Sequence, residues 1–143
     1  INYDPFFIKD KELYMNRLVE IVEEIYEECK EPNWDSYNSD PITINAKEKA
    51  IVLCDLIDEF YKEYNEDYMW VSPCPDGEYD FELTSRKNKD LGLFIDTTLD
   101  EKYMFQIIEI IRKDKITAET HKYGKDDLNG IRTILEDWIN EGN

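Results

Sequence analysis

Residues 33–77 read NWDSYNSDPITINAKEKAIVLCDLIDEFYKEYNEDYMWVSPCPDG, which places an aromatic connector, an amphipathic segment and the start of a strand directly after one another. The connector, Asn33 to Asp40, is polar and rich in turn residues, and it carries Trp34 and Asp35. A Trp between two helices buries a large ring while its indole N–H bonds an acceptor. An Asp in such a turn accepts hydrogen bonds from nearby backbone N–H groups. We therefore expect Trp34 to fill a helix junction and Asp35 to form the turn.

Apolar residues at helical spacing predict helices on both sides of this connector and at the end of the chain. These helices are expected over Asp10–Lys30, Asn45–Tyr64 and Asp126–Asn140. Pro32 ends the first, because proline cannot continue a helix. Asn45, with Glu48 three residues later, has the pattern of a capping box, so we expect Asn45 to cap the second. The inner stripes of the first two helices are Leu18, Ile21, Val22, Ile25 and Cys29, and Ala46, Ala50, Leu53, Ile57, Phe60 and Tyr64.

Alternating apolar and polar residues predict strands between the second and third helices. In Glu78–Leu83 every second residue is apolar, which is typical of a half-buried antiparallel strand. Asp76-Gly77 is a hairpin signal, and Pro73 restricts the preceding strand to an edge position or a strand end. The four strands are expected at Met69–Val71, Glu78–Leu83, Leu91–Ile95 and Tyr103–Ile111. The last is apolar on both faces and is placed centrally, with a helical start near Ile107 left open, and residues 113–125 are not assigned.

Together these elements predict a fold of the α+β class, an antiparallel four-stranded meander packed against helices in the order α-α-β-β-β-β-α. A chain of 143 residues is long enough for one compact domain with a real core, which we place over residues 1–143. Hydrophobic residues make up 41% and aromatic residues 13%, which argues against disorder despite a formal net charge of −17.

The distribution of charge and cysteine predicts a cellular setting. Nearly all of the acid excess lies before Arg112, and such a field opposes direct binding to nucleic-acid phosphates or to an anionic membrane. No apolar run reaches the ~20 residues of a membrane helix, and no signal peptide is visible. An odd, sparse set of cysteines (Cys29, Cys54 and Cys74) favours reduced thiols over a disulfide scaffold. We therefore expect a cytoplasmic protein.

One pattern carries a resemblance. It consists of Asn-Trp-Asp-x-Tyr at 33–37, Pro41-Ile42, the small residues Ala46 and Ala50, Phe60, Pro73-x-Pro75-Asp76-Gly77-Glu78 and Phe81-Glu82. This pattern, over roughly residues 33–95, resembles a widespread set of small bacterial and phage proteins of unknown function, in which the Asn-Trp-Asp turn also precedes a helix and a Pro-Asp-Gly hairpin. The chain departs from it by having no small residue after Asp35 and no Trp in the second strand. The resemblance implies a compact intracellular domain and no activity.

The sequence shows no pattern of a catalytic or cofactor site. His121 is the sole histidine, whereas zinc sites draw on several His or Cys ligands and a nucleophilic Ser or Cys needs a base. Neither a calcium-binding loop nor a glycine-rich phosphate loop occurs. We therefore expect no catalytic residue, no bound metal and no cofactor. A hydrolase that uses a carboxylate-bound metal stays open as an alternative, because acids are abundant.

The acids themselves are ordered, and this order carries the functional hypothesis. They follow two helix faces and one strand face, and in the strand the carboxylates recur every ~6.6 Å, somewhat like a row of phosphates. We expect a non-enzymatic protein that uses them to bind a basic protein partner, and a nucleic-acid-binding protein is one such partner. Inhibitors, antitoxins and DNA mimics, some of them phage-encoded, act in this way. The other alternative is an acidic housekeeping domain with no electrostatic partner. The expected contact residues are Glu20, Glu23, Glu24, Glu27, Asp55, Asp58, Glu59, Glu63, Glu78, Asp80 and Glu82.

Overall fold

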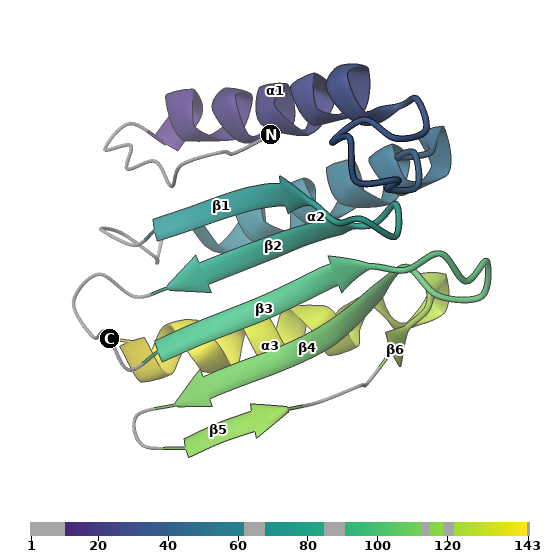
Figure 1. The fold of residues 1–143 in the computed structure, drawn as a ribbon. Helices are drawn as coiled ribbons and strands as arrows, with labels where there is room; N and C mark the ends of the chain where they lie inside the picture. The colour runs from purple at the N-terminus through teal and green to yellow at the C-terminus, as the bar shows by residue number, and fades with distance from the viewer. Residues whose placement is uncertain (1–10, 62–67, 85–90, 113–114, 119–121, 143) are drawn as a thin grey trace.

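The computed structural model describes residues 11–61, 68–84, 91–112, 115–118 and 122–142, and within them the helices lie on one side of a sheet (Figure 1). The helical elements are α1 (Lys11–Cys29), α2 (Ile44–Tyr61), the short 3-10 turn η1 (Lys125–Asp127) and α3 (Leu128–Gly142). The strands are β1 (Tyr68–Pro73), β2 (Tyr79–Thr84), β3 (Leu91–Thr97), β4 (Phe105–Arg112), β5 (Lys115–Ala118) and β6 (Lys122–Tyr123). No helix in these ranges combines the length and the apolar character that a membrane crossing requires.

The sheet is an antiparallel meander in which β1 to β5 follow one another across it. The predicted α+β class and the order of its first six elements and final helix are confirmed, with β1 on an edge and ending at Pro73 as expected. The sheet extends further than predicted, because β5 and β6 both pair with β4, from within the segment that the sequence left unassigned. Both are short and polar, and their pairing with β4 is what makes them strands. The region near Ile107 continues as strand through Arg112.

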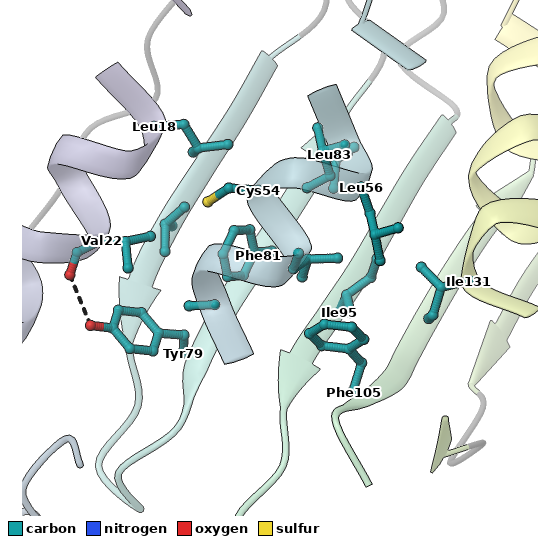
Figure 2. Packing of buried hydrophobic residues seen from close by; sticks show 14 of the residues in the cluster. Leu18, Val22, Cys54, Leu56, Tyr79, Phe81, Leu83, Ile95, Phe105 and Ile131 are labelled. Atoms are coloured by element: carbon teal, nitrogen blue, oxygen red, sulfur yellow. Dashed lines mark hydrogen bonds between the residues drawn. The ribbon is translucent and has the colours of Figure 1, made fainter. Parts of the chain in front are cut away.

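The core lies between the sheet and the helices. Side chains of β2 alternate as predicted, so that Tyr79, Phe81 and Leu83 are buried beneath the helices (Figure 2). The predicted inner stripe of α1 is buried along its whole described length, from Leu18 to Cys29, and α2 buries Ala46, Ala50, Leu53 and Ile57. Phe60 and Tyr64 of the predicted second stripe have side chains outside the described residues. Because apolar area buried this way contributes about 25 cal/mol per Å², the inner faces supply most of the stabilisation.

The beginning of α2 differs from the prediction. The helix starts at Ile44, and the Thr43 side-chain Oγ1 accepts a hydrogen bond from the Ala46 N–H at 3.1 Å. Thr43 is therefore the N-cap, and the expected cap Asn45 is an exposed residue of the first turn. The cap was predicted two residues too late, because Thr43 is itself a good N-cap and lies closer to Pro41, where the extended connector ends.

The two ends of the stretch 33–77 meet in space. The Asp40 N–H donates to the Pro75 carbonyl at 2.8 Å, and the Trp34 indole N–H donates to the Asp40 carbonyl at 2.8 Å. Gly77 has a φ of 92°, and a Cβ there would stand 2.8 Å from the Pro41 carbonyl oxygen, so only glycine fits this contact. The connector between α1 and α2 is thus tied directly to the β1–β2 hairpin.

The connector itself behaves as predicted. Trp34 is half-buried and packs against the core, and Asp35 accepts hydrogen bonds from the Tyr37 N–H and the Ser39 hydroxyl. Tyr37 lies in the same turn, and 86% of its surface is exposed. Trp34 therefore fills the helix junction while Tyr37 faces solvent.

A side-chain hydrogen bond joins β2 to α1. The hydroxyl of Tyr79, a fully buried residue, donates to the Val22 carbonyl at 2.8 Å (Figure 2). Tyr79→Phe should lower the free energy of unfolding by about 1 kcal/mol, because it removes this bond and keeps the ring. Urea denaturation followed by tryptophan fluorescence measures the change. Tyr37→Phe, at an exposed position, is the matched control and should be neutral; equal stability of both variants would contradict this role.

Candidate functional site

The face of the sheet turned away from the helices gathers carboxyl groups. Since Tyr79, Phe81 and Leu83 point toward the helices, Asp80 and Glu82 point to the opposite face. The same alternation in β3 buries Leu93 and Ile95 and turns Asp96 outward. Asp80 and Asp96 are direct partners across the β2–β3 pairing. Asp80, Glu82 and Asp96 thus form one group, which we call the acidic sheet face.

The members of the acidic sheet face are hydrogen-bonded to one another. Asp80 bonds the side chain of Asp96 on the neighbouring strand and the side chain of Glu82 on its own strand. Two carboxyl groups can share a hydrogen bond only when one of them is protonated, because ionised carboxylates are acceptors alone. Each of these contacts therefore includes one protonated carboxyl group when the hydrogen bond is formed.

The pKa values of Asp96 and Glu82, the two neighbours of Asp80, agree with this arrangement. Burial, followed by the hydrogen bond and charge of Asp80, raises the pKa of Asp96 to about 9. Burial, followed by the charge of Asp80, raises the pKa of Glu82 to about 7. At pH 7 Asp96 is thus protonated and Glu82 is close to half-protonated. Among the described residues, burial and neighbouring carboxyl groups raise the pKa values of Asp96 and Glu82.

One atom of the group has no hydrogen-bonding partner. Asp96 Oδ1 is buried and forms no hydrogen bond within the described part of the chain. A buried polar atom without a hydrogen bond lowers the stability of the folded protein by about 1–3 kcal/mol, and a donor that bonded to it would remove this penalty. Asp96 Oδ1 is therefore a buried acceptor to which the described residues supply no donor.

Further acids surround this group at the start of β2. Glu78 is half-buried, and burial, followed by the charge of Asp76, raises its pKa. Cys74 lies in the same neighbourhood, because burial and the charges of Asp96 and Asp80 raise the pKa of its thiol. A thiol with a raised pKa is a poor nucleophile. The strand residues predicted as contacts, Glu78, Asp80 and Glu82, are thus brought together, and Asp96 joins them.

The predicted acids of the helices lie elsewhere. On α1, Glu20, Glu23, Glu24 and Glu27 are exposed, and Glu27 pairs with Lys30 at 2.6 Å. On α2, Asp55 and Glu59 are exposed and Asp58 is half-buried, and Glu59 pairs with Arg132 of α3 at 3.0 Å. Glu63 lies outside the described residues. Because the helices cover the opposite side of the sheet, these acids and the acidic sheet face form separate surfaces rather than one ridge (Figure 1).

The three cysteines are free thiols, as predicted. Burial raises the pKa of Cys29 to about 11 and also raises that of the fully buried Cys54. Both lie in the core cluster, where a thiol acts as a small hydrophobic side chain.

Two findings complete the description of the site. In the described ranges, no three His, Cys, Asp or Glu side chains come together in an arrangement that could hold a metal ion. The chain matches no protein-family model, no curated protein and no solved structure. The resemblance stated for residues 33–95 therefore stays a prediction.

Proposed function

We propose that this protein is a non-enzymatic binding protein that engages a basic protein partner through the acidic sheet face. The observation that supports this most is the group of three neighbouring carboxyls on the face of the sheet turned away from the helices. Their proximity and burial raise the pKa of Asp96 and of Glu82, so ionising these groups burdens the free protein. A cation arriving from a partner would relieve that burden.

An arginine side chain of the partner suits the geometry best. A guanidinium presents several N–H donors in one plane and binds carboxylates through two bonds at once. After a small shift of the side chains around it, Asp96 Oδ1 would accept from one donor, and the neighbouring Asp80 side chain would accept from another. A basic segment of a nucleic-acid-binding protein has this chemistry, so inhibitors, antitoxins and DNA mimics, including phage-encoded ones, are the functional classes that we favour.

The helix acids contribute to this proposal at longer range. The exposed carboxylates of α1 add to a net charge of −17 and attract a basic partner before contact. They lie on the other side of the sheet from the acidic sheet face, so we assign them a role in the encounter rate. A cytoplasmic location belongs to the proposal as well, supported by the three free thiols, which a reducing compartment preserves.

The test compares two variants in binding kinetics with the basic protein that a pull-down from the native host recovers. The first variant replaces Asp80, Glu82 and Asp96 by Asn, Gln and Asn. It should bind about tenfold more weakly, chiefly through faster dissociation, because it removes contacts made in the complex. The matched control replaces Glu20, Glu23 and Glu24 by Gln and should mainly slow association.

Salt provides the second readout. Association of the unmodified protein should slow as salt rises, because charge attraction is screened over ~8 Å at physiological ionic strength. Equal losses of affinity in the two triple variants would mean that net charge alone matters. A flat salt dependence with unchanged affinity in the first variant would leave acidity as a solubility device and overturn the proposal.

A further inference from the structure

A cavity of about 470 Å³ opens at the end of the sheet where the β3–β4 loop and η1 meet the first turns of α2. It is distinct from the acidic sheet face. Its lining includes three lysines from three separate segments of the chain: Lys49 of α2, Lys102 of the β3–β4 loop and Lys125 of η1. Tyr103, Met104 and Gly124 form much of the wall between them.

Lys49 is unusual among these three because it is buried. Only 4% of its surface is exposed, and its ammonium donates to the Thr98 carbonyl at 2.7 Å and to the Asp100 carbonyl at 3.1 Å. Both acceptors are neutral, and within the described part of the chain no carboxylate forms an ion pair with Lys49. Burial lowers the pKa of Lys49, and the charges of Asp100, Glu78 and Glu101 act in the opposite direction. A buried ammonium with no anion in direct contact is costly, so an anion bonded to it would be favoured.

Backbone contacts hold the two segments that carry the other two lysines close to each other. The Asp100 carboxylate accepts from the Lys102 N–H at 3.0 Å, and the Asp100 carbonyl accepts from the Tyr103 N–H at 3.1 Å, which holds the loop in a tight turn. A Cβ on Gly124 would stand 3.0 Å from the Lys102 carbonyl oxygen, so the absence of a side chain lets the segment before η1 approach the loop.

Three acids also line the cavity, and all of them are exposed: Glu101, Asp126 and Asp127. The Asp127 carboxylate lies at the start of α3, with Oδ1 3.2 Å from where a Cβ on Gly130 would stand. The acids therefore extend into solvent, where their charges are screened in the same way as those of Lys102 and Lys125, whereas Lys49 is buried.

We propose that this cavity binds a small oxyanion, a phosphate or carboxylate group, between the Lys49 ammonium and the side chains of Lys102 and Lys125. An ammonium has three N–H donors, and Lys49 uses two of them on carbonyls in the described structure, so one remains for the anion. The anion would bond directly to this ammonium, whereas the carboxylates of Asp100, Glu78 and Glu101 act on it only through their charge. This inference is independent of the proposed function, because it involves no residue of the acidic sheet face.

The test is an NMR titration of the ¹⁵N-labelled protein with inorganic phosphate and, in parallel, with acetate, at constant ionic strength set by KCl. Amide signals of Lys102, Gly124 and Lys125 should shift and saturate, and the anion that saturates at lower concentration identifies the preferred class. At about 100 times the Kd, bound anion should raise the thermal midpoint by roughly 5–10 °C.

Three variants decide the outcome. Lys49→Met should abolish saturable binding, and the double variant Lys102→Gln/Lys125→Gln, which changes only exposed side chains, should weaken it at least fivefold even if Lys49→Met fails to fold. Lys47→Gln is the matched control, because Lys47 lies on the same helix but over the Tyr26 ring, outside the cavity. Unsaturable shifts with both anions, or equal weakening by Lys47→Gln and the double variant, would overturn the proposal.

Discussion

Trp34→Ala should lower the free energy of unfolding by about 3 kcal/mol, at the lower end of the range for buried aromatic residues because the ring is half-buried. The substitution removes the packing of the indole on the core and the hydrogen bond from its N–H to the Asp40 carbonyl. Asp40 in turn donates its own N–H to the Pro75 carbonyl, so the loss reaches the β1–β2 hairpin. Urea denaturation followed by far-ultraviolet circular dichroism measures the change without depending on tryptophan fluorescence.

Tyr37→Ala is the control for this experiment. Tyr37 is an aromatic residue of the same turn, but 86% of its surface is exposed, so its removal should change stability by no more than about 0.5 kcal/mol. If Trp34→Ala instead kept the stability of the unmodified protein and abolished partner binding, Trp34 would be a contact residue and its structural role would be wrong.

Asp96→Asn should stabilise the protein by about 2 kcal/mol at pH 8 and by close to nothing at pH 4.5. The pKa of Asp96 rises from an ordinary value of 3.8 to about 9 on folding, so between these values the folded state holds a proton that the unfolded state releases. The contribution of Asp96 to the free energy of unfolding therefore falls as the pH rises from about 4 to about 9. Asn keeps a donor for Asp80 and does not titrate. The expected gain is well below the free energy that the whole pKa difference corresponds to, because solvent screens the charge of a partly exposed group.

The measurement is a pair of denaturation curves for both proteins at each pH. Glu109→Gln is the matched control, since Glu109 lies opposite Phe94 on the same outer face and should change stability by no more than about 0.5 kcal/mol at either pH. A gain for Asp96→Asn that is equal at pH 4.5 and pH 8, or larger at pH 4.5, would show that Asp96 is not protonated in the folded protein.

The stability and binding experiments on Asp96 are expected to give opposite effects, so each result checks the other. Neutralising this residue should stabilise the free protein and, within the triple variant of the acidic sheet face, weaken partner binding. Residues that cost stability and serve binding are expected at functional surfaces, where activity and stability compete. A stabilising substitution with no effect on binding would indicate that the carboxyl group is merely tolerated.

The sequence determined the elements and the inner faces of this protein. The spacing of Leu18, Val22 and Ile25 predicted the buried stripe of α1, and the alternation from Tyr79 to Leu83 predicted which side of β2 is buried. These predictions held because helical and strand periodicities act within a few residues and are set by the burial of apolar area. The sequence offered two residues that cap helices well, Thr43 and Asn45, only two positions apart. The backbone conformation of the connector decided that Thr43 caps the helix.

Only the tertiary structure decided what the polar residues do. Asp80 and Glu82 could be assigned to one strand face, but the place of Asp96 opposite Asp80 depends on the register of β2 and β3, which pairs residues sixteen positions apart. The strands β5 and β6 form because their backbones pair with the free edge of β4. In the sequence, Lys49 is one of several basic residues of an amphipathic helix and nothing marks it as buried. Its ammonium is accommodated by the carbonyls of Thr98 and Asp100, which lie about fifty residues away in the sequence. Charge and hydrogen bonding act between groups that the fold brings together, and residue order alone does not specify those distances.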